Sequence, residues 1–193
     1  MKAVSICCFT ALLLAISAAG LHAAEVKDYS STIKVFQETP ALQPYFKSAY
    51  GYAVFPTIGK GGVGIGGAYG RGQVYRNGKV TGVSQMFQAS IGFQFGGQAY
   101  SQIIFFQDQR AYAEFTGGSF EFDATASAAA ITAGAQAQAG TKGATAGASA
   151  GPKTGAQAGA GYNKGMAIFI HAKGGLMYEA TIAGQKFSFE PVS

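Results

Sequence analysis

Cysteine is nearly absent from this chain, and its position excludes several kinds of chemistry. The two cysteines are the adjacent Cys7 and Cys8, and both lie inside an apolar stretch near the N-terminus. The rest of the chain can therefore form neither a disulfide nor a thiolate metal site. A lipoprotein anchor is not expected either, because its cysteine should follow the apolar stretch rather than lie within it.

Charged residues are scarce as well, at 12% of the chain, and they do not cluster. No two basic residues are adjacent, whereas blocks of like charge are typical of arms that bind nucleic acid. Nucleic acid is therefore not an expected partner. Without Lys2 the chain holds thirteen basic and nine acidic residues, a net charge of +4, which predicts no more than a weak attraction to anionic surfaces.

The first 24 residues have the order of a secretory signal peptide. Lys2 is followed by the uncharged apolar run 6–16 and then by small residues up to Ala24, which is the pattern of such a segment. The run is too short to span a bilayer, which takes about 20 residues; a buried helix of the mature domain is the alternative. We expect cleavage after residues 20–24 and export to the periplasm or cell envelope of a bacterium. The remaining residues 25–193 suit a single domain.

Residues 25–50 have the periodicity of an amphipathic helix followed by a shorter one. Apolar residues recur there at spacings of three and four, which builds one apolar stripe. The stripe consists of Val26, Tyr29, Ile33 and Phe36. Pro40 should end this helix, and residues 41–49 predict a second short helix with Pro44 near its first turn.

From Gly51 the periodicity changes to two, as in a β-strand. Residues 52–55 predict a buried strand that stops at Pro56, and residues 61–76 predict a longer strand with one nearly bare face. The glycines of that face are Gly62, Gly64, Gly66, Gly70 and Gly72. Glycine within a strand usually marks the close approach of another backbone or a ligand. That neighbour is either the protein itself, as its N-terminal helix or a sharply coiled sheet, or a lipid chain or headgroup.

Turn and cap signals divide the next part of the chain. Asn77-Gly78 is a strong hairpin signal. The fully apolar run 103–106 predicts a central strand, and Asp108 should cap a short helix that ends at Gly117. Further strands are expected at 91–95, 120–135, 166–172, 176–183 and 186–189.

These signals together predict a mainly β (α+β) domain. We expect a strongly coiled, glycine-rich antiparallel sheet, barrel-like or folded as a sandwich, with the N-terminal amphipathic helix and one or two short helices. A low-complexity tract of small residues at about 138–160 interrupts it. This tract is either loose, which is the favoured interpretation, or part of two small-residue strands.

Two glycine patterns suggest nucleotide binding but lack the residues that it needs. The segment from Lys60 to Gly66 begins like a phosphate-binding loop, yet Ile65 and Gly66 stand where lysine and Ser or Thr should be. The same glycines match a dinucleotide fingerprint, which requires a following helix and an acid about 20 residues on. The next acid is Asp108, so neither cofactor is expected.

Hydrolytic and metal chemistry find little support. His171 is the only histidine after the signal segment, whereas a nucleophile needs a positioned base. Glu121 and Asp123 share one strand face and could meet a cation, but an exposed polar edge is the favoured interpretation. We therefore predict no enzyme, no metal site and no cofactor.

Several blocks of the chain resemble, in order, blocks of the SYLF domain. They are Gly51–Pro56, the strand from Gly61 to Gly72, Gly92–Phe106, Asn163–Gly165 and Lys173–Ala180. The resemblance runs from about residue 30 to the end, interrupted by the low-complexity tract. Each block is weak by itself, but their order and spacing together are fairly specific.

The resemblance implies a non-enzymatic module that binds lipid or a membrane surface. Phosphoinositides are the lipids bound by fungal and animal members, and some members bind actin. An N-terminal amphipathic helix contributes to lipid contact in animal members, and residues 26–37 match it by position. Actin is not an expected partner, because the predicted export leads to a compartment without it. A structural or protein-interaction role in the cell envelope is the alternative.

The candidate lipid-binding residues are of two kinds, cations for anionic headgroups and apolar side chains for insertion. They are Lys27, Ile33, Lys34, Phe36, Lys60 and Arg71. In the competing interpretation, Ile33 and Phe36 instead pack on the β-sheet and stabilise the fold.

Overall fold

The N-terminal part of the domain folds into short helices for local reasons. In this computed structural model, α1 spans Ser30–Gln37, a 3-10 turn η1 spans Pro40–Leu42, and α2 spans Gln43–Ser48. The Asp28 carboxylate accepts a hydrogen bond from the Ser30 backbone N–H at 2.8 Å. This bond lowers the pKa of Asp28. The prediction of two helices separated at Pro40 is confirmed.

The structure describes residues 26–92, 98–123, 126, 128–131, 161–173, 182 and 184–192. The predicted signal segment, the tract 138–160 and most of the predicted strands 91–95 and 176–183 lie outside these residues. The predictions about them remain open.

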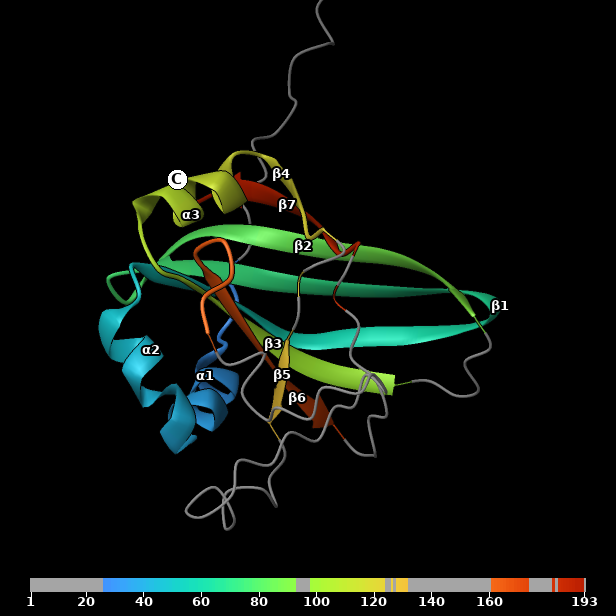
Figure 1. Cartoon of the computed structure of the whole chain (residues 1–193), viewed down its shortest axis with the longest axis horizontal. Coiled ribbons are helices and arrows are strands. Elements are labelled where there is room, and N and C mark those ends of the chain that lie inside the picture. Colours follow the sequence, from blue (N-terminus) through green and yellow to red (C-terminus); the bar gives the residue numbers. More distant parts are fainter. Residues whose placement is uncertain are drawn as a thin grey trace, which may run out of the picture.

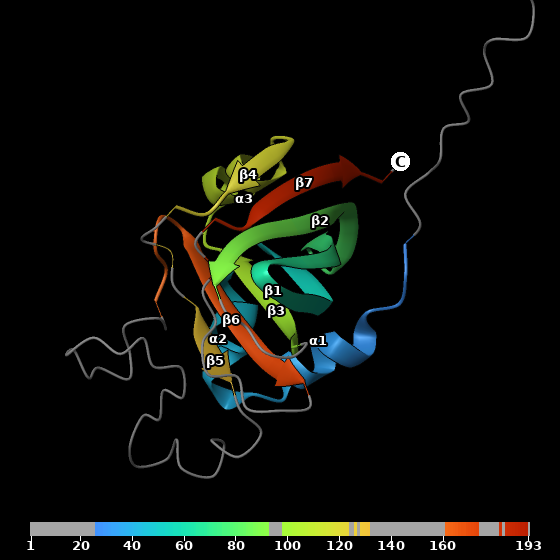
Figure 2. The same ribbon diagram turned by 90° about the vertical axis from the view of Figure 1, so that its right-hand side faces the viewer.

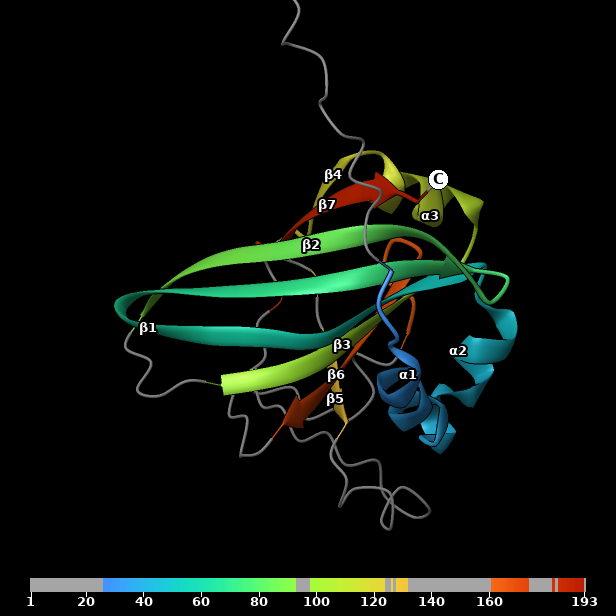
Figure 3. The same ribbon diagram turned by 180° about the vertical axis from the view of Figure 1, so that it is seen from behind.

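Strand β1 spans Gly51–Arg76 and doubles back near its middle, so that its two arms lie side by side (Figures 1 and 3). The first arm pairs with β3 (Gln98–Phe106) and the second with β2 (Lys79–Gly92). The prediction that the first strand stops at Pro56 is wrong. The strand absorbs the proline, which lacks an N–H, at a register shift between Phe55 and Ile58, a place where a sheet tolerates proline.

A two-residue turn joins β1 to β2, which spans Lys79–Gly92. Asn77 and Gly78 both have positive φ angles, 51° and 73°. This conformation matches the right-handed twist of the flanking strands, and Asn-Gly adopts it at little cost. The hairpin predicted at this dipeptide is confirmed.

The seven strands found among the described residues belong to one sheet with the order β4-β7-β2-β1-β3-β6-β5 (Figures 1 and 2). The other strands are β3 (Gln98–Phe106), β4 (Ser119–Glu121), β5 (Ala129–Ile131), β6 (Met166–Lys173) and β7 (Lys186–Pro191). Neighbours are antiparallel except β5 and β6, which are parallel. The mainly β prediction is confirmed, but the sheet is single and open rather than a closed barrel or a sandwich. Its edges are the three-residue strands β4 and β5.

The sheet buries a part of each of its faces, each in a separate cluster. The α1-side face carries Val54, Ile103 and Phe105 beneath α1 and α2. The opposite face, called the α3-side face, carries alternate residues, among them Ile104 and Phe106, and packs against helix α3 (Gln109–Thr116). Residues 103–106 are therefore buried on both sides, as expected of a central strand.

Buried glutamines hold the segment before β7 against β3. Gln102 Nε2 donates to Gln185 Oε1 at 2.9 Å, and Gln185 Nε2 donates to the hydroxyl of Tyr100 at 3.1 Å. Burial raises the pKa of Tyr100, so its hydroxyl stays protonated. Buried polar groups are tolerated when they are paired in this way. The network contributes to the placement of β7 beside β2.

Helix α3 (Gln109–Thr116) begins at the predicted cap. The Asp108 carboxylate accepts a hydrogen bond from the Ala111 backbone N–H at 2.9 Å. We expect Asp108→Ala to lower the free energy of unfolding by about 1 kcal/mol, the usual cost of losing such a cap. Urea denaturation measures this change. Asp108→Asn keeps the acceptor oxygen and should be milder, so equal losses in both variants would contradict the capping role.

Candidate functional site

Two exposed aromatic side chains form a cross-strand pair on the sheet. Tyr69 of β1 is paired with Phe87 of β2, and the two residues are 50% and 55% exposed. They lie on the α1-side face, because Tyr75 has the same parity as Tyr69 and belongs to the cluster beneath the helices. The Tyr69 hydroxyl lies 3.3 Å from Oε1 of Gln85, to which it donates a hydrogen bond.

Small residues and one cation surround this pair, because Phe87 also pairs with the exposed Lys186 of β7. Gly67 and Ala89 form a neighbouring pair toward the bend of β1. A Cβ added at Gly59 or Gly61 would meet no atom within 4 Å. Helices α1 and α2 lie at the end of the long strands that is opposite the bend of β1 (Figure 3). The two aromatic rings therefore stand on an uncovered part of the sheet.

Arg71 borders the aromatic pair, and Lys27 lies further along the same face of the sheet. Arg71 is exposed and follows Tyr69 by two positions on the same face. Gln73, two residues further, donates through Nε2 to the backbone oxygen of Lys27 at 2.8 Å and accepts from the Tyr75 hydroxyl at 2.7 Å. The structure thus brings the backbone of Lys27 near Gln73 and Arg71, although Lys27 and Arg71 are 44 positions apart in the sequence. Within the described ranges, neither of the two cations forms an ion pair.

The three candidate lipid-binding residues of α1 are either buried or paired. Phe36 is 0% exposed, and Ile33 packs against the same cluster on the sheet. The Lys34 ammonium is exposed but lies 3.8 Å from the Glu38 carboxylate. Ile33 and Phe36 therefore pack on the β-sheet, as in the competing interpretation of the sequence. Phe36 cannot enter a membrane while α1 is docked. Of the apolar side chains of α1, Val35 is exposed, at 41%.

Lys60 is not part of the group formed by Lys27 and Arg71. It follows Ile58 by two positions on β1, and Ile58 belongs to the core of the α3-side face. Alternate residues of a strand point to opposite faces. Lys60 therefore lies on the face opposite Arg71.

The predicted glycine face is the α3-side face of the second β1 arm, and the protein itself fills the space beside it. A Cβ at Gly72 would lie 2.6 Å from the Val54 carbonyl oxygen and 2.6 Å from the Phe55 ring. A Cβ at Gly70 would lie 2.6 Å from the Ile58 side chain. Of the two neighbours considered for these glycines, the coiled sheet is the one observed at Gly70 and Gly72. The structure does not describe the surroundings of Gly62 and Gly64, and Gly66 is half-buried.

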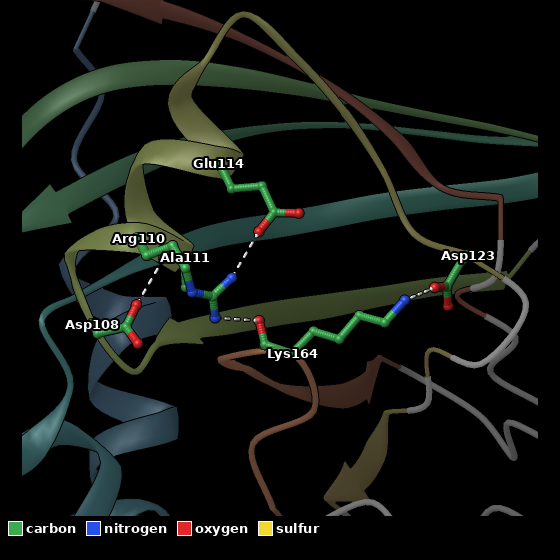
Figure 4. A network of polar contacts seen from close by, with 6 residues as sticks. All are labelled: Asp108, Arg110, Ala111, Glu114, Asp123 and Lys164. Carbon is green, nitrogen blue, oxygen red and sulfur yellow. Dashed lines mark hydrogen bonds and ion pairs between the residues drawn. The ribbon is translucent and has the colours of Figure 1, made fainter.

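A second polar area surrounds a pocket between α3, β4 and the start of β6. Phe120, Phe122, Met166 and Ile168 line it together with Glu114, Glu121, Asp123, Ala126, Asn163 and Lys164. The Lys164 ammonium points at the Asp123 carboxylate, and Arg110 lies between Glu114 and the Lys164 backbone oxygen (Figure 4). The bond to Asp123 raises the pKa of Lys164. Arg110 and Glu114 pair within α3, whereas Lys164 and Asp123 join segments that are distant in sequence.

The acidic residues singled out from the sequence both lie at this edge. Glu121 is 3.4 Å from the Lys186 ammonium, and Asp123 is paired with Lys164. Both pairs are exposed, which agrees with the favoured interpretation of a polar edge. Over the residues that the structure covers, no group of three His, Cys, Asp or Glu side chains gathers to hold a metal ion. No helix in the same ranges has the length and apolar character needed to span a bilayer.

Phe87 is the surface residue that sequence reasoning missed. It lies between Met86 and Gln88, both buried on the α3-side face. Its neighbours of the same parity, Gln85 and Ala89, give no sign of an apolar face. Pairing with Tyr69 depends on the register that the Asn-Gly turn and the following bulge impose. This register was the only signal that could have identified the pair, and it could not be derived without knowing where the bulge lies.

Two comparisons place the chain among known proteins. Residues 87–190 match the profile of the Ysc84 family, which is described as "Las17-binding protein actin regulator". Beta cell expansion factor A of Aeromonas veronii is 31% identical over 163 residues, which cover 82% of this chain and 52% of that protein. The chain therefore spans about half the length of this relative. The profile match, the identity over most of the chain and the blocks recognised in the sequence agree: the protein belongs to the Ysc84 (SYLF) family.

Proposed function

We propose that this domain binds the surface of membranes that contain anionic lipid. The observation that carries the proposal is the exposed Tyr69–Phe87 pair, with Arg71 two positions from Tyr69 and Lys27 held near Gln73 on the same face. Tyrosine and phenylalanine suit the boundary between headgroups and acyl chains, because their rings are apolar and tyrosine keeps a polar tip. The SYLF resemblance supports the same class of ligand. Export to the cell envelope is part of this proposal, as is the absence of actin as a partner.

The attraction of the two cations would not by itself give even a millimolar dissociation constant. Each Lys or Arg near an anionic leaflet contributes about 1 kcal/mol. Arg71 and Lys27 together would supply about 2 kcal/mol, whereas a millimolar dissociation constant corresponds to about 4 kcal/mol. Burial of one large apolar side chain contributes about 1.5–3 kcal/mol. The aromatic pair must therefore supply the larger part of the affinity.

Flotation with liposomes tests the proposal. We expect the purified protein to float with vesicles of phosphatidylglycerol and phosphatidylcholine, and not with phosphatidylcholine alone. The double change Arg71→Gln with Lys27→Gln should weaken binding at low salt and flatten its salt dependence, because salt screens exposed charges. Arg110→Gln is the matched control, since Arg110 is a surface cation on a different element and is paired with Glu114. Intact-mass measurement of the same sample establishes whether the predicted signal segment has been removed.

Absence of flotation with any anionic lipid would contradict membrane binding and favour the role as an envelope interaction protein. Vesicles that contain a phosphoinositide in place of phosphatidylglycerol decide the finer question of lipid class. Stronger binding to the phosphoinositide at equal surface charge would assign headgroup specificity. Equal binding would assign a general preference for anionic surfaces.

A further inference from the structure

The element that meets the membrane can be assigned, given the proposed function. We infer that the exposed middle of the β1–β2 pair inserts into the lipid interface through Tyr69 and Phe87, while α1 stays docked on the sheet. The partner of this surface is a bilayer with anionic headgroups. The inference rests on the proposed function but is separable from it by experiment.

The apolar stripe of helix α1 packs against the sheet and is not available to lipid. Phe36 is fully buried and Ile33 is packed on the sheet, so the stripe that would enter a membrane is occupied. The chain just before α1 is also held, because Gln73 binds the Lys27 backbone oxygen. The remaining charge of the helix is partly neutralised, since Lys34 lies beside Glu38. Release of α1 would expose the cluster beneath it to water, which opposes detachment.

The middle of the β1–β2 pair has the opposite properties. Tyr69 and Phe87 are half exposed without any need for rearrangement. A side chain is absent at the nearby Gly67, and the cross-strand neighbour of Phe87 on its other side is the exposed Lys186 of β7, a long cation that can reach headgroups. Figures 1 and 3 show α1 and α2 toward the end of the long strands away from the bend of β1, and the exposure of both rings shows that neither helix covers them. Arg71 lies on the same face, where a cation would meet headgroup phosphates.

The composition of the chain allows a direct test, because the protein contains no tryptophan. Phe87→Trp and Val35→Trp each introduce a single fluorescent probe at an exposed apolar position, one on β2 and one on α1. With vesicles of phosphatidylglycerol and phosphatidylcholine, the emission of the Phe87→Trp protein should shift to shorter wavelength. Lipids brominated on their acyl chains should quench it. The emission of the Val35→Trp protein should stay unchanged.

A binding variant completes the test. Tyr69→Ser with Phe87→Ser should reduce binding to the same vesicles at least tenfold at every salt concentration, with little change in melting temperature. If the protein floats but the probe at residue 35 shifts, α1 has inserted and the inference is overturned, whether or not the probe at residue 87 also shifts. Flotation with neither probe shifted would indicate binding by charge alone, and this too overturns insertion of the aromatic pair. Loss of flotation in the unaltered protein would instead refute the proposed function.

Discussion

Replacing Phe36 by Ala should lower the free energy of unfolding by about 3–5 kcal/mol, the usual cost of truncating a buried phenylalanine. Phe36 is 0% exposed and belongs to the cluster that α1 and α2 form with Ile103 and Phe105 of β3. The change would remove this ring and leave a cavity that its rigid neighbours fill only in part. Denaturation with urea, followed by circular dichroism, measures the loss.

Val35→Ala is the matched control on the same helix. Val35 is 41% exposed, and substitutions at such positions usually change stability by less than about 0.5 kcal/mol. Similar small effects of both changes would mean that α1 is not docked in solution. That result would also return Phe36 to the residues available for lipid, and would weaken the assignment of insertion to the sheet.

Gly72→Ala should be among the most damaging changes of a glycine in this protein. The added Cβ would lie 2.6 Å from the Val54 carbonyl oxygen and from the Phe55 ring. The two arms of β1 would have to move apart, because the oxygen belongs to the backbone and has no alternative rotamer. Overpacking of this kind costs about 1–3 kcal/mol, and occasionally more. The midpoint of urea denaturation should fall accordingly.

Gly59→Ala provides the comparison within the same strand. A Cβ there meets nothing within 4 Å, so the change adds no clash and reduces the entropy of the unfolded chain. We expect a stability equal to the unaltered protein or higher by about 0.4–1 kcal/mol. Equal losses at both glycines would show that glycine is required for backbone freedom along β1, rather than for the close approach of its arms.

Local signals in the sequence predicted the local structure well. Asn77-Gly78 forms the expected turn, Asp108 caps the expected helix, and residues 103–106 form the expected central strand. Each of these outcomes depends on residues that are adjacent or nearly so. The strand end predicted at Pro56 failed, because a register shift against β3 accommodates the proline. The partner strand that permits this shift lies more than 40 residues away.

The candidate site was predictable only in part. The sequence identified Lys27 and Arg71 as cations but gave no reason to place them on one face, whereas the bond from Gln73 holds the Lys27 backbone near the strand that carries Arg71. It also gave Phe36 two possible roles, and helical periodicity could not choose between them. An apolar stripe has the same pattern whether it faces a sheet or a membrane.

The sequence by itself determined the family, the mainly β class and the positions of the turns and caps, because these depend on residue types and short spacings. The tertiary structure decided which apolar residues remain exposed. Phe36 and Phe87 are the same residue type, yet one is fully buried and the other is 55% exposed. Exposure depends on what the rest of the chain places against a side chain: α1 docks on the sheet through Phe36, whereas no helix covers Phe87 at the middle of the β1–β2 pair.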